Sequence, residues 1–395
     1  MTGTVLVLNA GSSSLKYQLL DPTDGTRLAH GIADRIGEER STIEHDASGT
    51  TTHREAVLAT HEDALAAVMD LFGEVGPHLA DAGIVAVGHR VVMGGRAFDG
   101  PALVDDEVEA TIERLAPLAP LHNPPNLACI RVARALLPDV PHVAVFDTAF
   151  FHDLPAAAAT YALDRDVAER HGIRRYGFHG TSHQYVSEAA ARFLGRDLAD
   201  LRQVVLHLGN GASASAIAGG RPVDTSMGLT PLEGLVMGTR TGDLDPAIVL
   251  HLVRTAGMDL DEVDALLNRR SGLRGLTGHN DLREVHRMVA EGDADARLGL
   301  HVYLHRLRKY VGAYVAVLGG LDVLVFTAGV GENDPVVRAE VCAPLAVLGI
   351  EIDPERNAVR GTDPRRISPD GAPVEVLVVP TDEEIAIARG AVSLL

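Results

Sequence analysis

Two arginines lie among glycine and apolar residues, where a permanent charge needs an anionic ligand or partner. Arg90 lies in the segment HRVVMGGRAF, shortly before Gly94 and Gly95, and Arg240 lies in EGLVMGTRTGDLDP. A lone arginine is usually a solvated surface residue. An arginine held among glycine and apolar residues can instead present its planar fork to a phosphate or a carboxylate. We therefore interpret Arg90 and Arg240 as candidate anion-binding residues.

Asp147 and His179 are ionisable residues in similarly apolar surroundings. Asp147 ends a strand-like run in VFDTAFF, where a carboxylate needs a cation, a metal or a raised pKa to be tolerated. His179 lies in YGFHGTSHQY, and we expect a helix to begin at residues 180–182. The N-terminus of a helix there could face an anion. From these residues alone, the alternative is a core histidine whose hydrogen bonds are satisfied within the protein.

Three glycine-rich turns follow strand-like runs: NAGSSSLK (9–16), HLGNGAS (207–213) and FTAGVGEN (326–333). Successive N–H groups in such turns can surround an anion, and Lys16, one of only two lysines, adds a charge. We expect Asn9–Ser14 to be a six-residue loop, longer than a simple hairpin turn. Ligands of open sheets bind at the carboxyl ends of strands, so the three turns together indicate a phosphate site. For each turn alone, an ordinary hairpin or tight turn is the alternative, and no P-loop or dinucleotide fingerprint occurs here.

The segment PTDEEIAIARG places Asp382, Glu383 and Glu384 in the first turn of an expected helix. Acidic residues are favourable there because of the helix dipole alone. A role in binding magnesium is the more specific interpretation of the same residues.

Strand-like and helix-like runs alternate along the chain, which indicates an α/β fold with largely buried sheets. The expected strands are Val5–Leu8, Leu15–Leu20, Ile84–His89, His142–Phe146, Val204–Leu208, Ala212–Ala218, Val323–Thr327 and Val374–Val379. The expected helices include His61–Phe72, Asn126–Leu136, Ser182–Leu194 and Leu298–Leu318. The apolar segment Tyr310–Gly331 is long enough to span a membrane, but Gly319 and Gly320 interrupt it. We interpret it as a buried helix, a break and a buried strand, Asp322–Thr327.

A repeated strand–turn–strand pattern in the sequence indicates two related domains. Val5–Leu20 and Val204–Gly219 each read as a strand, a polar turn and a second strand, with Gly11 and Gly211 in the same place. Chance similarity of two hairpins is the alternative. A chain of 395 residues is long for one core and suits two domains, which the stretch His152–Ala162 could join.

Composition restricts the possible partners. Hydrophobic residues make up 46% of the chain, and the formal net charge is −19. This acidity argues against nucleic acid or an anionic membrane as a partner, while a small anion remains possible if cations gather at its site. Cys129 and Cys342 form no metal or redox motif, so we expect buried free thiols in a reducing compartment. The beginning MTGTVLVLNAG has no signal-peptide character, and we expect a cytoplasmic protein.

Taken in order, the motifs resemble those of the acetate/propionate/butyrate kinase family in the actin–hexokinase superfamily. The shared segments are NAGSSSLK, GHRVVMGG, LAPLHNPPN, VFDTAFF, RRYGFHGTSH, HLGNGAS, DTSMGLTPLEGLVMGTRTGDLDP, SGLRGLTG, NDLR, FTAGVGEN and PTDEE. The resemblance implies α/β architecture with two duplicated actin/hexokinase-like (ribonuclease H-like) domains and an active-site cleft between them. Residues 1–150 with the C-terminal helix 384–395 would form one domain. Residues 151–383 would form the other, which binds nucleotide and makes a homodimer.

The resemblance also implies a role for each motif. Arg90 would bind acetate, Asp147 matches the residue usually called the proton donor or acceptor, and His179 and Arg240 match the transition-state stabilisers. The implied pocket for the acetate methyl group comprises Val92, Leu121, Phe178 and Pro231. The implied ATP-binding residues are Lys16, His207, Leu208, Gly209, Asn210, Gly211, Asp281, Leu282, Arg283, Gly329, Val330, Gly331, Glu332 and Asn333. The implied magnesium residues are Asn9 and Glu383, and Glu384 is the neighbour of Glu383.

The reaction implied is reversible transfer of the ATP γ-phosphoryl group to acetate, with Mg²⁺ or a substituting Mn²⁺, giving acetyl phosphate and ADP. Acetate is already ionised near pH 7, so no base is needed to create the nucleophile. Catalysis of phosphoryl transfer is mostly positioning and electrostatic stabilisation. We therefore hypothesise that Asp147 orients magnesium, its water or an arginine, more than it removes a proton.

Three other functions remain as alternatives. Propionate kinase is the nearest, because one extra methylene changes binding by only about 1–3 kcal/mol. An ATP-binding switch like the chaperone or actin branches would lack the paired arginines and the apolar slot. A phosphatase of the same superfold would need an activated water. In one departure from the family pattern, Met93 stands where histidine is common, which could alter the polarity or the preference of the acid site.

Overall fold

The chain forms two compact units, each built around its own sheet. The structure is a computed structural model that describes residues 3–11 and 13–395. Ser12, which belongs to the predicted first phosphate turn, lies outside the described residues. Unit 1 comprises the chain up to His152 together with Asp382–Leu395, and unit 2 comprises Asp153–Thr381. The predicted domains have boundaries at residues 150 and 383, and their division into functional domains stays a prediction.

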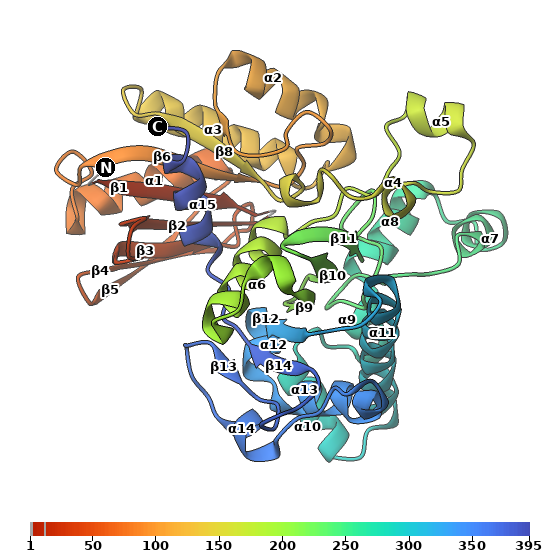
Figure 1. The fold of residues 1–395 in the computed structure, drawn as a ribbon. Coiled ribbons are helices and arrows are strands. Elements are labelled where there is room, and N and C mark those ends of the chain that lie inside the picture. The colour runs from red at the N-terminus through yellow and green to blue at the C-terminus, as the bar shows by residue number, and fades with distance from the viewer. Residues whose placement is uncertain (1–2, 12) are drawn as a thin grey trace. The chain divides into compact units, whose positions relative to one another are not determined.

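Unit 1 contains a sheet with the strand order β5-β4-β3-β2-β1-β6-β8-β7 (Figure 1). Its strands are β1 (Thr4–Ala10), β2 (Ser14–Leu20), β3 (Arg27–Asp34), β4 (Ser41–Ala47), β5 (Thr50–Ala56), β6 (Ile84–Val91), β7 (Ala102–Leu103) and β8 (His142–Phe146). Its helices are α1 (His61–Val75), α2 (Asp106–Arg114), α3 (Asn123–Leu136) and α15 (Glu383–Val392), with the 3₁₀ turns η1 (Ala116–Leu118) and η2 (Ala149–Phe151).

Unit 2 contains a sheet with the strand order β11-β10-β9-β12-β14-β13. Its strands are β9 (Arg202–Leu208), β10 (Ala212–Ala218), β11 (Arg221–Thr225), β12 (Val323–Thr327), β13 (Arg365–Arg366) and β14 (Glu375–Val378). Its helices are α4 (Ala156–Ala159), α5 (Arg165–Arg170), α6 (Gly180–Leu194), α7 (Ala247–Thr255), α8 (Leu260–Arg269), α9 (Gly272–Thr277), α10 (Leu282–Ala290), α11 (Ala294–Leu318), α12 (Ala328–Asn333), α13 (Pro335–Cys342) and α14 (Pro354–Ala358), with the 3₁₀ turns η3 (Leu198–Asp200) and η4 (Ala343–Leu348).

The two sheets share one topology. In unit 1, β1 pairs antiparallel with β2 and parallel with β6, β2 pairs antiparallel with β3, and β6 pairs parallel with β8. In unit 2, β9, β10, β11, β12 and β14 repeat this arrangement with the same directions. The order β3-β2-β1-β6-β8 therefore matches β11-β10-β9-β12-β14. This match confirms that the repeated strand–turn–strand pattern in the sequence reflects two related folding units.

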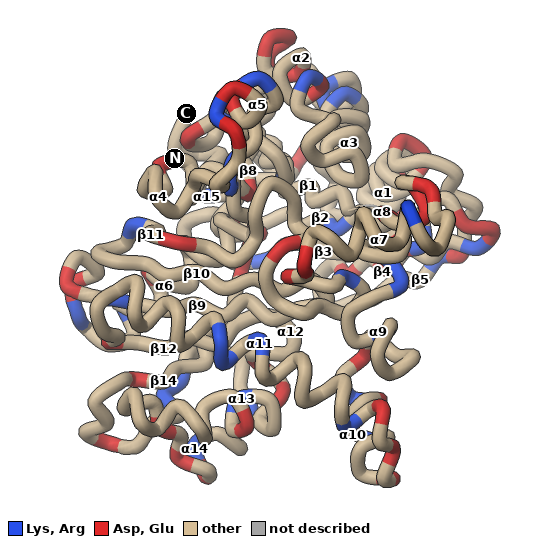
Figure 2. Tube along the Cα trace, turned by 90° about the vertical axis from the view of Figure 1, so that its right-hand side faces the viewer, with Lys and Arg blue, Asp and Glu red and all other residues tan. Residues whose placement is uncertain are grey.

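Helices cover the sheets with apolar faces. Helix α1 begins with a capping box between Thr60 and Asp63, and its buried face meets the sheet in a core that includes Leu65 and Phe72. In unit 2, β9, β10 and β12 run mostly without charged residues in Figure 2, as expected for strands covered on both faces. The core of each unit thus supports the hairpin strands, which fixes the strand-end residues such as Asn9 and Leu208.

The expected strands and helices are present, with small differences at their ends. Strands β8, β10 and β12 have the predicted bounds, and α6 begins at Gly180 as predicted. The Tyr310–Gly331 segment does contain a helix, a break and a strand, but α11 is buried along one side only, with Val317 52% exposed. Both cysteines are buried and free, as predicted. Within the described ranges, no helix combines the length and the apolar character needed to cross a membrane.

Two expectations about the hairpin turns are wrong. Asn9 belongs to β1 and pairs with Lys16 across the hairpin, so Asn9–Ser14 is not a six-residue loop. Gly11 directly follows β1, whereas Gly211 directly precedes β10, so the two glycines do not hold the same place. The residue that directly follows β9 is Gly209. The error arises because pairing register depends on the whole strand and not on the turn residues alone.

Candidate active site

Four predicted site residues of unit 1, namely Asn9, Arg90, Asp147 and Glu383, form one connected cluster. Arg90 donates from Nε to Oδ1 of Asp147 at 2.9 Å and from NH2 to Oδ2 at 2.6 Å. Its NH1 donates to Oδ1 of Asn9 at 3.1 Å, and its Nε lies 3.8 Å from Oε2 of Glu383. A guanidinium has five N–H groups, so two remain beyond these bonds to described residues. They can serve the carboxylate of a substrate.

Strand alternation explains why these side chains meet. Leu6 and Leu8 of β1 belong to the core formed with α1 and α3, so Asn9 points to the opposite face of the sheet. Its cross-strand partner Lys16 points to the same face. That face is covered by α15, whose Ile387 would collide with a side chain at Gly88 of β6. Arg90, two residues after Gly88, therefore also lies on the α15 face, near the helix end that carries Glu383.

Carboxylates outnumber cations in this cluster. Although burial disfavours the charged guanidinium, Asp147 and Glu383 raise the pKa of Arg90. Burial raises the pKa of Glu383, with a further contribution from Asp147, while Arg90 and Lys16 act in the opposite direction. Burial and the charge of Glu383 also raise the pKa of Glu384. A buried acidic group of this kind favours an additional cation.

The donor atoms suit magnesium. Asn9, Asp147 and Glu383 supply oxygen ligands, which Mg²⁺ prefers, and they gather around one arginine. In the part of the chain that the structure describes, no group of three or more His, Cys, Asp or Glu side chains could hold a metal ion by itself. Mg²⁺ is usually held by one or two carboxylates together with waters and substrate phosphates. The residues present therefore fit a metal that binds together with the nucleotide.

Two buried asparagines hold the loop that follows β6. Asn126 accepts from the N–H of Val92 at 3.1 Å and donates to the carbonyl of Ala10 at 2.7 Å. Asn123 exchanges two hydrogen bonds with the backbone of Met93, both 3.0 Å long. The loop after Arg90 is thereby fixed to the end of β1. Both asparagines lie in the LAPLHNPPN motif, and we had assigned them no role from sequence.

The predicted apolar pocket residues differ in burial. In unit 1, Val92 is buried and Leu121 is 36% exposed. In unit 2, Phe178 is buried, and the carbonyl of Pro231 accepts from Arg240 NH1 at 3.0 Å. Met93, which departs from the family pattern, is fully buried. Its side chain therefore acts through packing under the loop, as an apolar group where histidine is common.

In unit 2, His179 and Arg240 converge on the second hairpin turn. A Cβ atom built on Gly211 would lie 3.6 Å from Arg240 NH1 and 3.7 Å from His179 Nε2. Both side chains therefore lie within van der Waals distance of the position that a Cβ atom would take at Gly211. His179 itself has φ 58°, ψ 26°, a left-handed conformation that is uncommon for a residue with a side chain. Strained residues of this kind are concentrated at functional sites.

Arg240 is a partly buried cation that has no anionic partner among the described residues. Its NH1 contacts the carbonyl of Pro231 and the sulfur of Met237, and it forms no ion pair with any residue that the structure describes. Burial lowers the pKa of its guanidinium. An anion that binds next to Arg240 would restore the lost charge stabilisation, so the site has a strong preference for negative charge.

The N-terminus of α9 supports the backbone around Arg240. The N–H of Leu273 donates to the carbonyl of Met237, and the N–H of Ser271 donates to that of Thr239. Gly272 has φ 62°, and a Cβ atom there would lie 2.2 Å from the Met237 carbonyl oxygen. Only glycine fits this position. The SGLRGLTG motif therefore holds the Met237–Arg240 segment, a role that sequence reasoning missed although the repeated glycines marked the place.

The segment from His207 to Gly211 leads from β9 into the hairpin turn. His207 stacks on His179, with ring centroids 4.2 Å apart. Leu208 is fully buried and serves the core. The N–H of Gly209 donates to the carbonyl of Gly211 across the turn. Asn210 accepts from the side chain of Asn280 at 3.1 Å. This bond connects the turn to the segment that carries the predicted ATP-binding residues Asp281 to Arg283.

The buried Arg338 bonds to the backbone of the GVGEN segment, residues 329–333. Arg338 donates from NH1 to the carbonyls of Gly331 and Glu332, and from NH2 and Nε to Asn357. Burial lowers its pKa to about 10, with a contribution from the neighbouring charge of Arg365. Ala328, just before the glycines, has the left-handed φ of 62°. The backbone of this segment is therefore fixed.

The remaining predicted nucleotide residues have mixed surroundings. Gly329, Val330, Gly331, Glu332 and Asn333 lie on or near the short helix α12. Glu332 accepts from the N–H groups of Ala328 and Thr381, so its carboxylate supports the loop. Leu282 is buried, whereas Arg283 is exposed and bonds to Asp281. The structure thus makes Arg283 and Asp281 surface groups and Leu282 a packing residue.

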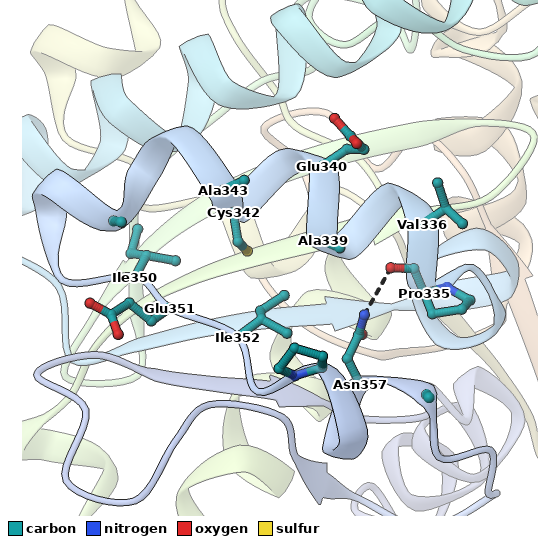
Figure 3. A pocket seen from close by; sticks show the side chains of 13 residues that line it. Pro335, Val336, Ala339, Glu340, Cys342, Ala343, Ile350, Glu351, Ile352 and Asn357 are labelled. Atoms are coloured by element: carbon teal, nitrogen blue, oxygen red, sulfur yellow. Dashed lines mark hydrogen bonds between the residues drawn. The ribbon is translucent and has the colours of Figure 1, made fainter.

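A separate apolar cavity of about 580 Å³ lies beside α13 (Figure 3). Val336, Ala339 and Ile352 contribute apolar lining, and Asn357 donates to the carbonyl of Pro335 at its edge. None of the predicted site residues lines it. The predicted chemistry is therefore located at the strand ends and not in this cavity.

The chain is similar to known proteins over nearly its whole length. The Acetokinase family matches residues 4–389. An acetate kinase of Leifsonia xyli subsp. xyli is 59% identical over 387 residues, which is 98% of each chain. The crystal structure of Porphyromonas gingivalis acetate kinase matches with a TM-score of 0.93 at 42% identity, over 99% of each chain. A propionate kinase structure from Francisella tularensis subsp. tularensis matches with a TM-score of 0.94 at 39% identity, over 100% of each.

The fold and these comparisons define the protein as an α/β phosphotransferase, a kinase. The chain belongs to the Acetokinase family. The α/β fold and the family expected from the sequence are therefore confirmed.

Proposed function

We propose that this protein catalyses reversible, Mg²⁺-dependent transfer of the ATP γ-phosphoryl group to acetate, giving acetyl phosphate and ADP by direct in-line transfer. The observation that supports the reaction type is the convergence of Arg240 NH1 and His179 Nε2 on the turn at Gly211. The choice of acetate is supported by the curated relatives at 58–59% identity that are named acetate kinase.

Arg90 is proposed to hold the acetate carboxylate. Its two N–H groups that are not bonded to Asp147 or Asn9 can donate to the substrate, while Asp147 fixes the plane of the guanidinium. Asn9 and Glu383 are proposed to hold magnesium, with Mn²⁺ as a substitute. When bound, the metal would supply positive charge to the nucleotide phosphates.

Arg240 and His179 are proposed to stabilise the transferring phosphoryl group. The acetate oxygen forms a bond to the γ-phosphorus while the bond from this phosphorus to the ADP oxygen breaks. Charge then spreads over the equatorial oxygens, where Arg240 and an N–H of His179 can donate. Acetate attacks as an anion, so the chemistry leaves Asp147 no proton to remove, and its bidentate bond to Arg90 supports an orienting role.

ATP is proposed to bind along the glycine turns. The proposed contacts are Lys16, His207, Leu208, Gly209, Asn210, Gly211, Asp281, Leu282, Arg283, Gly329, Val330, Gly331, Glu332 and Asn333. Backbone N–H groups of such turns can donate to phosphate oxygens. Because Glu332 and Leu282 are occupied by backbone and core contacts, we propose that they contribute through their main chain.

Val92, Leu121, Phe178 and Pro231 are proposed to surround the acetate methyl group. Propionate kinase is the second candidate, and the match to a propionate kinase structure over the whole chain supports keeping it. An extra methylene is worth only about 1–3 kcal/mol, so propionate is expected to react as a weaker substrate.

Helix α7 is the proposed surface for a homodimer. No residue of this apolar helix is buried, and Ile248, Leu250 and Val253 are 43%, 52% and 36% exposed. Figure 1 places α7 at the edge of unit 2, away from its sheet. The same patch on two copies can form a two-fold contact, which is the commonest arrangement of soluble dimers. The occupant proposed is therefore a second copy of this chain.

Trapping of the acyl phosphate tests the proposed reaction. The protein is incubated with ATP, Mg²⁺ and acetate, propionate or butyrate, and hydroxylamine converts any acyl phosphate to a hydroxamate. We expect the most hydroxamate from acetate and less from propionate. Absence of hydroxamate with all three acids would contradict the kinase function, and a preference for propionate would favour the second candidate.

A further inference from the structure

Behind His179 lies a chain of buried hydrogen bonds that the reaction as described does not use. His179 Nδ1 lies 2.9 Å from the hydroxyl of Ser213, and the same hydroxyl lies 2.7 Å from His183 Nε2. His183 Nδ1 in turn lies 2.7 Å from the hydroxyl of Ser215. His183, Ser213 and Ser215 are each fully buried. Both nitrogens of His183 are thus matched to serine hydroxyls.

The spacing of these residues in the sequence explains the chain of hydrogen bonds. His179 is the N-cap residue of α6, and the N–H of His183, four residues later, donates to its carbonyl, so both rings lie at the start of the helix. Ser213 and Ser215 are two residues apart on β10, so they share one face of the sheet. The pairing of Ser213 with His207 places that stacked histidine on the same face. The residues therefore meet where the start of α6 faces β10.

We propose that Ser213 and His183 are positioning residues, which with Ser215 hold the His179 imidazole as the tautomer that carries its proton on Nε2. The proposal rests on the proposed function. Each serine hydroxyl and each neutral imidazole ring has one hydrogen to donate. The hydrogen bonds along the chain must therefore all run in the same direction. Ser215 donates to His183 Nδ1, His183 Nε2–H donates to Ser213, and the Ser213 hydroxyl donates to His179 Nδ1.

This direction matches the chemistry at the other end of the ring. His179 Nε2 lies beside Gly211, 3.7 Å from the position that a Cβ atom would take there, and Arg240 NH1 lies 3.6 Å from the same position. A phosphoryl oxygen there requires a donor, because a bare nitrogen would repel it. In the reversed direction, a neutral His179 would carry its proton on Nδ1 and offer a bare Nε2. The hydroxyl of Ser213 therefore decides whether the neutral ring can donate.

The direction of these bonds decides which nitrogen of His179 donates when the ring is neutral. Burial and the neighbouring His207 hold the pKa of His183 well below its usual value, so His183 is neutral and can act as both donor and acceptor. A fixed tautomer matters because the wrong one can cost several orders of magnitude in rate in a histidine-dependent enzyme.

A set of serine variants tests the proposal in the hydroxamate assay. We expect Ser213→Ala to lower kcat about 10- to 100-fold with the KM for ATP and acetate within about 3-fold, and Ser213→Thr, which keeps the hydroxyl, to restore most of the rate. Ser187→Ala is the matched control, because Ser187 is a buried serine whose hydroxyl donates to the Gln184 carbonyl of the same helix. Its kcat should stay within about 2-fold of the wild type.

The same substitution in a His179→Ala background separates positioning from general stability. If Ser213 acts through His179, Ser213→Ala should cause no further loss of residual activity once the imidazole is gone. Two results would overturn the proposal: an equal loss of activity in both backgrounds, or an unchanged kcat for Ser213→Ala alone. Neither result would affect the proposed function as long as the wild type is active. Absence of acyl phosphate from the wild type would overturn both.

Discussion

The carboxylate of Asp147 and the guanidinium of Arg90 form a two-point ion pair, with N–O distances of 2.9 and 2.6 Å. Asp147 is almost fully buried, and Arg90 is its partner in this ion pair. The pair fixes the orientation of Arg90 and leaves its remaining N–H groups for a ligand. A carboxylate committed in this way is poorly placed to act as a base, which supports an orienting role in the proposed reaction.

Substitution of Asp147 by asparagine tests this role. Asp147→Asn keeps the shape but removes the charge from the bidentate bond. An asparagine would hold the Arg90 guanidinium less firmly, and misplacing a substrate-binding group can cost about 100-fold, so we expect kcat/KM for acetate to fall by about that factor. The shape of the pH–rate profile between about pH 6 and 8.5 should not change, since no proton transfer is lost. A shifted profile with normal magnesium dependence would show that Asp147 acts as a base.

Gly272→Ala is expected to disturb the Arg240 segment. The added Cβ would lie 2.2 Å from the carbonyl oxygen of Met237, and the backbone there has φ 62°. We expect a loss of about 2–4 kcal/mol in the free energy of unfolding by urea, with kcat reduced as well. Gly278→Ala is the control, because Gly278 has φ 83° but nothing within 4 Å of the new atom. Equal destabilisation by the two variants would show that backbone strain alone, without the clash, explains the effect.

The ion pair between His286 and Asp334 should make stability depend on pH. Its nitrogen and oxygen lie 2.7 Å apart, and the hydrogen bond raises the pKa of His286. Burial alone would raise the pKa of Asp334, but His286 and the N–H of Val337 lower it below its usual value.

The stability from His286 is fully present below its unfolded pKa of about 6.5 and is lost as the pH rises through the raised folded pKa. The stability from Asp334 is present above about pH 4 and is lost as the pH falls through the lowered folded pKa. The Tm difference between the wild type and His286→Gln should therefore be largest between about pH 4 and 6.5, and smaller near pH 9. A difference that stays constant from pH 5.5 to 9 would contradict the ion pair.

A charge on α7 is expected to separate the proposed dimer. Leu250→Glu places a carboxylate in the centre of the apolar patch, where burial against a second copy would be costly. We expect sedimentation velocity to show a dimer for the wild type and a monomer for the variant, with an unchanged circular dichroism spectrum. Leu298→Glu, at a position 59% exposed on α11, is the control and should stay dimeric. A wild-type monomer would rule out the homodimer, and a variant that remains dimeric would place the interface elsewhere.

The buried strands were predictable because their composition and their environment agree. Strands β8, β10 and β12 are short apolar or small-residue runs bounded by turn residues, and every residue of β8 and β12 is buried. Strands β3, β4 and β5 went unpredicted because they carry charged and hydroxyl side chains with little buried surface on β5. Their pairing depends on neighbours that are remote in sequence, which local pattern cannot supply.

The candidate site was predictable as a set of residues but not as a set of contacts. The types of Arg90, Asp147 and His179 and their apolar surroundings marked them for chemistry. The bond from Arg90 to Asp147 depends on the register of β6 against β8, and the chain behind His179 depends on α6 facing β10. The positioning role of Gly272 needed the backbone conformation, because a sequence shows the glycine but not its φ.

The most direct test of the proposed transfer uses acetate labelled with ¹⁸O in both carboxylate oxygens. The proposed attack of the acetate oxygen on the γ-phosphorus predicts acetyl phosphate with one ¹⁸O bonded to phosphorus, visible as a shifted ³¹P resonance, together with unlabelled ADP. A ³¹P resonance of acetyl phosphate without the isotope shift, or release of inorganic phosphate alone, would contradict direct transfer to the carboxylate.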